Sequence, residues 1–255
     1  MSMLQSAGVF LMSPALTAVT PWIILLTAVI YIFLHGRRHN KIIAHLSIIT
    51  GFIPILIHEI GHAVMATVTR GSVGNIYMVL TPDRQMREGR QGFAETGSRN
   101  WLSSVLITFA GYSFPPLFFI AGVFLAVQGY SIIFIGILIL MFLYYLWHTS
   151  QKWLPILIII LLIIGSFSII TSSSGFAAGS INTFYSIILG LLLGEMIQSI
   201  IITAKINFKG GIEWDGTAMR QLTYIPATIW WFVWAVISIW SMYQSFQLVT
   251  HALNL

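Results

Sequence analysis

Long apolar runs separated by short polar connections dominate this chain of 255 residues. A membrane-spanning helix needs about 20 mostly apolar residues, and seven runs come close to that length or exceed it. They predict spans at about 16–35, 42–68, 101–127, 130–148, 153–171, 181–204 and 225–249. We therefore expect an all-α polytopic membrane protein with about seven transmembrane helices, six or eight being the alternatives, in a single membrane-embedded domain over residues 1–255.

The one sizeable polar segment runs from Arg70 to Asn100. Within it, the short apolar run Ile76–Leu80 and the stretch Gln91–Gly97 flank a basic turn, Arg84–Arg90. This pattern predicts a small β-hairpin after the second span, with an ordinary surface loop as the alternative. An exposed hairpin edge can hold an extended peptide by strand addition. The candidate substrate-binding residues are therefore Gly92, Phe93 and Ala94.

Composition agrees with a membrane protein that has little soluble mass. Hydrophobic residues make up 57% of the chain and charged residues only 7%, against about 25% charged in an ordinary soluble domain. The net charge of +5 is spread over the short connections, which indicates membrane topology rather than nucleic-acid binding. Because the chain has no cysteine, only His, Asp, Glu and water are available to bind zinc.

The basic residues also predict an orientation, since cytoplasmic connections carry an excess of Lys and Arg. The connections after the second, fourth and sixth predicted spans carry nine of the twelve basic residues, and the other side carries Arg37, Arg38 and Lys41. This count places the amino terminus and residues 70–100 in the cytoplasm. The Arg37–Lys41 cluster argues locally for the opposite orientation.

Candidate chemistry is concentrated in the second predicted span, which contains His58-Glu59-Ile60-Gly61-His62. Two histidines four residues apart on a helix lie about 40° apart on one face, so both imidazoles can bind one zinc ion. Glu59 projects to the same side, where it can deprotonate a water molecule. This is the H-E-x-x-H pattern of metalloproteases.

The same pattern also occurs by chance in soluble helices, where the histidines need no metal. Here it lies among apolar neighbours such as Ile53, Leu56 and Val64. Burying two histidines and an unpaired glutamate there would be costly without a partner. A metal site is therefore favoured over structural histidines.

The residues alone leave two candidates for a third protein ligand. Glu195 lies about ten residues before Lys205, hence about 15 Å deep at 1.5 Å per residue, and His62 lies about 12 Å deep by the same rise. Asp215 is shallower, but the glycine pair at 210–211 allows the chain to fold back, so that Asp215 begins a new helix among the others.

These features resemble the site-2 protease superfamily of intramembrane zinc metallopeptidases, in its compact bacterial branch without a PDZ domain. The resemblance rests on the His58–His62 motif, on the hairpin-like segment after it, and on Asp215-Gly216 followed by Leu222–Pro226 and Trp230. The longer Asn-x-x-Pro-x-x-x-Leu-Asp-Gly pattern of the better-known members is absent. The resemblance implies His58, His62 and Asp215 as ligands of one zinc ion, Glu59 as the general base, and a bacterial plasma membrane as the location.

An enzyme of this kind would hydrolyse peptide bonds of membrane proteins within or near the bilayer. Zinc acidifies water and polarises the scissile carbonyl, while Glu59 carries the proton from water to the leaving amine. A helical substrate must unwind before attack because its backbone is already hydrogen-bonded. The expected partners are a membrane-protein or peptide substrate and the lipid bilayer, and no nucleic acid.

Two other functions remain compatible with the sequence. In a multispan transporter or metal permease, the histidines would form a transit site, and metal flux in proteoliposomes would reveal it. A catalytically inactive relative that binds membrane helices is the second, but Glu59 is present and gives no reason to prefer it.

Overall fold

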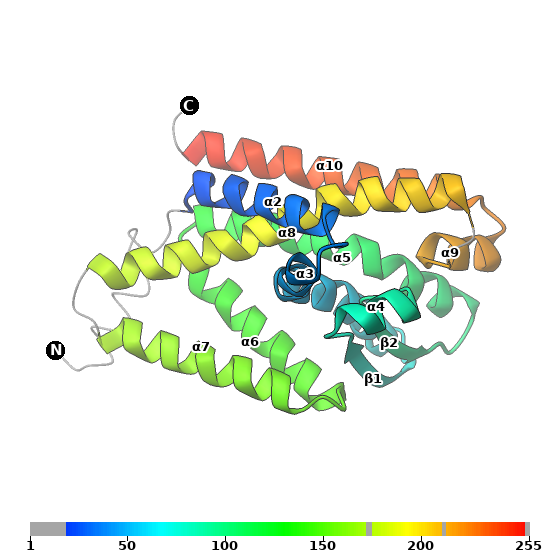
Figure 1. Cartoon of the computed structure of the whole chain (residues 1–255), viewed down its shortest axis with the longest axis horizontal. Helices are drawn as coiled ribbons and strands as arrows, with labels where there is room; N and C mark the ends of the chain where they lie inside the picture. The colour runs from blue at the N-terminus through cyan, green and yellow to red at the C-terminus, as the bar shows by residue number, and fades with distance from the viewer. Residues whose placement is uncertain (1–18, 172–174, 211–212, 253–255) are drawn as a thin grey trace.

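The computed structural model describes residues 19–171, 175–210 and 213–252, which form nine helices and one two-stranded sheet (Figure 1). The elements are, in chain order, α2 (Pro21–Gly36), α3 (Lys41–Val68), β1 (Ser72–Met78), α4 (Pro82–Glu88), β2 (Gly92–Gly97), α5 (Trp101–Val127), α6 (Ser131–His148), α7 (Trp153–Thr171), α8 (Gly175–Lys209), α9 (Asp215–Thr223) and α10 (Ala227–Ala252). The fold is therefore mostly helical, as the hydrophobic pattern predicts.

Four helices in the described residues are long and apolar enough to cross a membrane: α3, α5, the part Asn182–Lys209 of α8, and α10. Helix α2 and the part Ile133–His148 of α6 are apolar but shorter, and α7 has the bounds of the fifth predicted span. The total of about seven spans stays a prediction. The first three residues of the first predicted span, 16–18, lie outside the described part.

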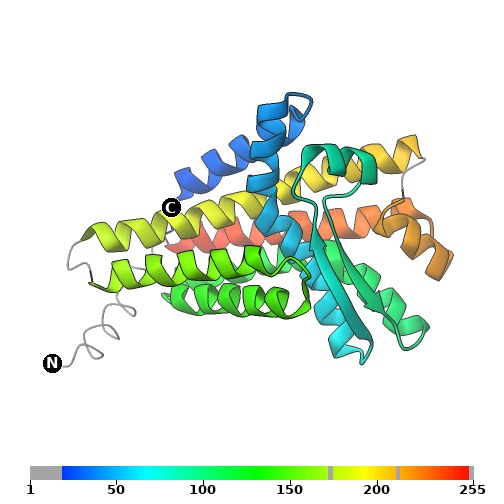
Figure 2. The same ribbon diagram turned by 60° about the horizontal axis from the view of Figure 1, so that its bottom comes forward.

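Helix α3 crosses the long helices α5, α8 and α10 rather than running alongside them (Figures 1 and 2). At its start, the side chain of Asn40 accepts hydrogen bonds from the backbone N–H groups of Ile42 and Ile43, which satisfies donors that the first helical turn leaves free. The helix continues through Pro54. Its middle, including Ile57, Glu59 and Ile60, is buried, so the H-E-x-x-H motif lies in the core.

Helices α2 and α8 approach closely at two glycines of α8, four residues apart. A Cβ atom at Gly190 would lie 2.6 Å from the Cβ of Thr27, and one at Gly194 would lie 2.7 Å from the Cβ of Tyr31. Small residues at this spacing let the backbones of membrane helices meet. The close approach brings Tyr31 beside the residue that follows Gly194, Glu195.

The hairpin predicted after the second span is confirmed. Strand β1 pairs with β2 in antiparallel register from Ser72 opposite Gly97 to Met78 opposite Gly92. The first strand begins four residues before the predicted run Ile76–Leu80, and the connection is the short helix α4 instead of a simple turn. This helix ends at Gly89, whose φ of 66° lies in the left-handed region that favours glycine.

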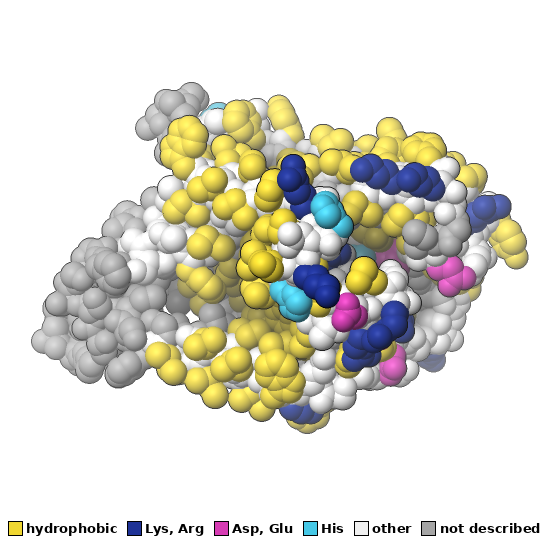
Figure 3. Space-filling model, viewed as in Figure 1, with side chains coloured by type: hydrophobic (Ala, Val, Ile, Leu, Met, Phe, Trp, Pro, Cys, Tyr) yellow, Lys and Arg dark blue, Asp and Glu magenta, His cyan; other side chains and the backbone are white. Residues whose placement is uncertain are grey.

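The tip of the hairpin lies beside the turn between α2 and α3. The guanidinium of Arg38 donates hydrogen bonds to the side-chain oxygens of Gln85 (2.9 Å) and Gln91 (2.8 Å). Arg37–Lys41 and the tip of the segment Arg70–Asn100 are therefore neighbours, and the side of the membrane that each faces stays a prediction. Charged side chains gather on this end of the molecule, as Figure 3 shows, while hydrophobic side chains cover much of the rest of that face.

Candidate metal centre

Helix geometry places His58 and His62 one turn apart on α3. Their Nε2 atoms lie 3.2 Å from each other, and the ring of His58 packs edge-on against Tyr112 of α5, with the ring centroids 4.7 Å apart. The other ring nitrogen of His62, Nδ1, lies 2.7 Å from the carbonyl oxygen of Ile107. Since a carbonyl can only accept, Nδ1 carries the proton, and Nε2 is left with a free lone pair.

Asp215 reaches the same point from a distant part of the chain. It is the first residue of α9, which folds back against α5 and α10. The turn into this helix is held by Thr217, whose hydroxyl accepts a hydrogen bond from the backbone N–H of Trp214 at 2.9 Å. One oxygen of Asp215, Oδ2, lies 3.4 Å from the Nε2 of His58 and 3.2 Å from that of His62. The predicted fold-back and the new helix at Asp215 are therefore present.

These three ligand atoms form the group of His, Asp or Glu side chains in the described residues that could hold a metal ion. Ligands about 2.0–2.1 Å from a tetrahedral zinc lie about 3.3–3.4 Å from one another, which matches the observed separations of 3.2–3.4 Å. The Oδ2 atom of Asp215 is buried and has no hydrogen-bond partner in the described part of the chain. A buried carboxylate oxygen without such a partner, beside two ring nitrogens, fits a cation.

Electrostatics favour an ionised Asp215. Burial alone raises the pKa of its carboxyl group, but the positive charge that His62 and His58 carry when protonated outweighs burial and holds the pKa below its ordinary range. An anionic oxygen beside two nitrogen lone pairs is the donor set that a divalent metal ion of borderline softness prefers.

Close packing of α5 on the site depends on Gly111. A Cβ atom there would collide with the Nε2 of His62 and would lie 2.9 Å from the Oδ2 of Asp215. The ring of Tyr112, the next residue, contacts His58, Trp214 and Trp234. The sequence analysis did not predict either residue as part of the site, although a glycine-aromatic pair inside an apolar span was a possible signal.

Glu59 is buried and faces the hairpin. A Cβ atom at Gly92 would lie 3.2 Å from its Cγ, and the backbone of Ala94 reaches its carboxylate. Two of the three predicted substrate-binding residues thus lie beside Glu59. The third, Phe93, stacks on Tyr77, with ring centroids 5.4 Å apart, outside the cavity described next.

A cavity of about 370 Å³ opens at the site. Its lining includes His58, Glu59, Asp215 and Gly92 on the side of the motif and the hairpin, and Glu195 and Gln198 on α8. The carboxylate of Glu195, the alternative third ligand, accepts a hydrogen bond from the hydroxyl of Tyr31. The structure therefore brings Asp215, and not Glu195, into contact with the two histidines.

A partly buried His/Asp group among long apolar helices defines a membrane protein with a candidate metal centre. The family model described as Peptidase M50B-like matches residues 22–245. The chain therefore belongs to the Peptidase M50B-like family, which is the site-2 protease family. Searches of curated proteins and of solved structures return no match. Family membership indicates a membrane metallopeptidase, with membrane proteins as substrates.

Proposed function

We propose that this protein is a zinc endopeptidase that hydrolyses peptide bonds of membrane proteins within or near the bilayer. The observation that carries the proposal is the convergence of His58, His62 and Asp215 beside a buried Glu59. Zinc held by these three residues would polarise the scissile carbonyl and acidify water. Only three protein ligands are present in this group, which leaves room for the reactants.

Glu59 is the general base of the proposed reaction. Its carboxylate takes the proton of the attacking water and later delivers it to the nitrogen of the leaving amine. The ring of Tyr112 and the carbonyl of Ile107 hold the imidazoles of His58 and His62 in orientation.

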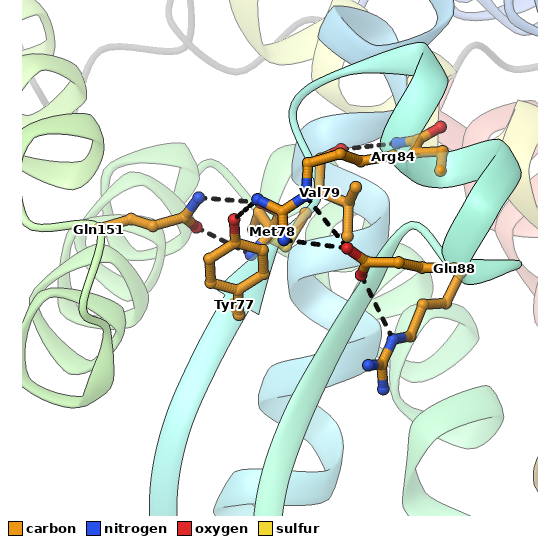
Figure 4. Close-up of polar contacts among 8 residues, drawn as sticks. Tyr77, Met78, Val79, Arg84, Glu88 and Gln151 are labelled. Atoms are coloured by element: carbon orange, nitrogen blue, oxygen red, sulfur yellow. Dashed lines mark hydrogen bonds and ion pairs between the residues drawn. The ribbon is translucent and has the colours of Figure 1, made fainter.

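The outer edge of β1 is already paired, whereas the outer edge of β2 is available to a substrate. Gln151, from the connection between α6 and α7, accepts a hydrogen bond from the backbone N–H of Met78 and donates one to its carbonyl oxygen, both at 2.9 Å. Figure 4 shows Gln151 approaching β1 from the side away from β2. In the described part of the chain, no third strand pairs with β2. We infer that an unwound substrate segment pairs with β2 along Gly92–Ala94, next to Glu59.

Replacing Glu59 by Gln tests the assignment. The variant should fold and retain zinc, but its cleavage rate should fall by a factor of about 10²–10⁴, because glutamine keeps the shape of the side chain without the base. The assay measures cleavage of co-expressed single-span membrane proteins together with the zinc content of the purified full chain. His58→Ala and His62→Ala serve as contrasts and should lose both zinc and activity. Near-normal cleavage by Glu59→Gln would refute the role of Glu59 as the base.

A further inference from the structure

Gln198 has a buried side-chain amide whose oxygen has no hydrogen-bond partner in the described residues. It lies one helical turn after Glu195 on α8 and lines the cavity at the candidate metal centre. The residue is only 7% exposed, and its Oε1 atom has no hydrogen-bond partner in the described residues. An unpaired buried amide oxygen destabilises a fold, so its presence on the cavity wall points to a ligand that pairs with it.

The cavity separates Gln198 from the hairpin. Gln91 and Gly92 line one part of it, and Gln198 and Ser199 of α8 line another. An extended peptide directs its N–H and C=O groups alternately to its two sides. A substrate paired with β2 therefore satisfies half of these groups on the hairpin and presents the other half toward α8. Where the substrate displaces water from the cavity, these remaining groups also need partners.

The chain already contains a side-chain amide that pairs with a strand in this way. Gln151 forms two hydrogen bonds with the peptide groups of Met78, one through its Oε1 and one through its Nε2. A glutamine amide thus supplies a donor and an acceptor at the spacing that a strand edge requires. Gln198 has the same chemistry and faces the cavity without a strand to pair with.

We propose that Gln198 binds the backbone of the substrate, pairing its side-chain amide with a peptide group on the edge that faces away from β2. The proposal rests on the proposed protease function, because it needs a substrate that lies extended beside the candidate metal centre. It assigns to α8 a recognition role that depends on the unwound backbone and not on side-chain identity. The substrate class is any membrane segment that can be drawn out into a strand at this point.

A stability measurement separates this role from a structural one. Gln198→Leu removes the unpaired oxygen and keeps a similar volume, so the full chain should unfold at the same temperature as the wild type or at a higher one. A structural role for the amide would instead lower the unfolding temperature. Gln247→Leu, on α10 outside the cavity lining, is the matched control.

Binding of a defined probe then tests the contact itself. The probe is a peptidyl hydroxamate built from Leu and Ala, with analogues in which one backbone N–H at a time is methylated, applied to the zinc-loaded full chain in detergent. The dissociation constant of the parent probe should rise about tenfold in Gln198→Leu, as expected for loss of a hydrogen bond to a buried peptide group. Methylation of the probe at one position should lower its affinity for the wild type and for Gln247→Leu by a similar factor, but should not lower its affinity for Gln198→Leu.

The outcomes distinguish the two proposals. Two results would overturn the role of Gln198 and leave the protease function standing. One is that Gln198→Leu binds the probe as tightly as the wild type does. The other is that methylation weakens binding to Gln198→Leu as much as it weakens binding to the wild type. Failure of the probe to bind the wild-type protein, together with no cleavage of membrane proteins by the wild type, would overturn the protease function first.

Discussion

Asp215 and Glu195 are both partly buried near the histidines, but their surroundings differ. The Oδ2 atom of Asp215 lies within 3.4 Å of both Nε2 atoms, whereas the carboxylate of Glu195 accepts a hydrogen bond from Tyr31. We therefore predict that Asp215→Asn loses zinc on dialysis and abolishes cleavage, because the amide is a weak ligand without charge. Glu195→Gln should keep zinc. Elemental analysis of the dialysed proteins checks both, and zinc lost from Glu195→Gln but kept by Asp215→Asn would make Glu195 the ligand.

Individual residues differ in how far the sequence reveals them. His58, Glu59 and His62 are predictable because their relation depends only on the local repeat of one helix. Asp215 needed the family resemblance, since no local rule relates α9 to α3. No sequence pattern indicates Gln198, because its unpaired oxygen is visible only once the cavity is formed.

At the level of elements, Gly111 is the position where α5 touches the candidate metal centre. We predict that Gly111→Ala lowers zinc affinity, because the added methyl group would displace the imidazole of His62 and the carboxylate of Asp215. Gly136→Ala in α6 is the control, since a Cβ atom there meets nothing within 4 Å. Competition with a chromophoric zinc chelator measures the difference. Equal affinities in the two variants would contradict the close approach of α5.

The elements themselves were predicted where the signal is local. The hairpin follows from two strand-like runs, but α4 was missed because the overlapping stretch Arg84–Arg90 was interpreted as a basic turn. Pro at the first position of α4 and Gly89 after its end are helix boundary signals. The close contact of α2 with α8 has a sequence signal as well, glycines four residues apart at 190 and 194, but that signal does not say which helix packs there.

At the scale of the whole molecule, the four connections that carry all twelve Lys and Arg residues meet at one end. Arg38 binds Gln91 at the tip of the hairpin, and Ser150, beside Lys152, donates its backbone N–H to Asn75 of β1 at 2.8 Å. Trp101, just after the hairpin, donates to the carbonyl oxygen of Leu222, near the end of α9, at 2.6 Å. The count of nine basic residues against three assumed that α3 separates Arg37–Lys41 from the hairpin. The contacts bring these segments together.

We therefore predict that the turn between α2 and α3 lies on the cytoplasmic side together with the hairpin, because basic connections stay on that side. The beginning of α2 would then face away from the cytoplasm, and α3 would lie across the other helices without carrying the chain to the far side. Single cysteines are clean probes because the chain has none. In intact cells, His39→Cys and Ser98→Cys should both resist an impermeant thiol reagent, while Gln128→Cys, in the connection between α5 and α6, should react. Reaction at His39→Cys with protection at Ser98→Cys would show instead that α3 spans the bilayer, as the hydrophobic pattern alone predicts.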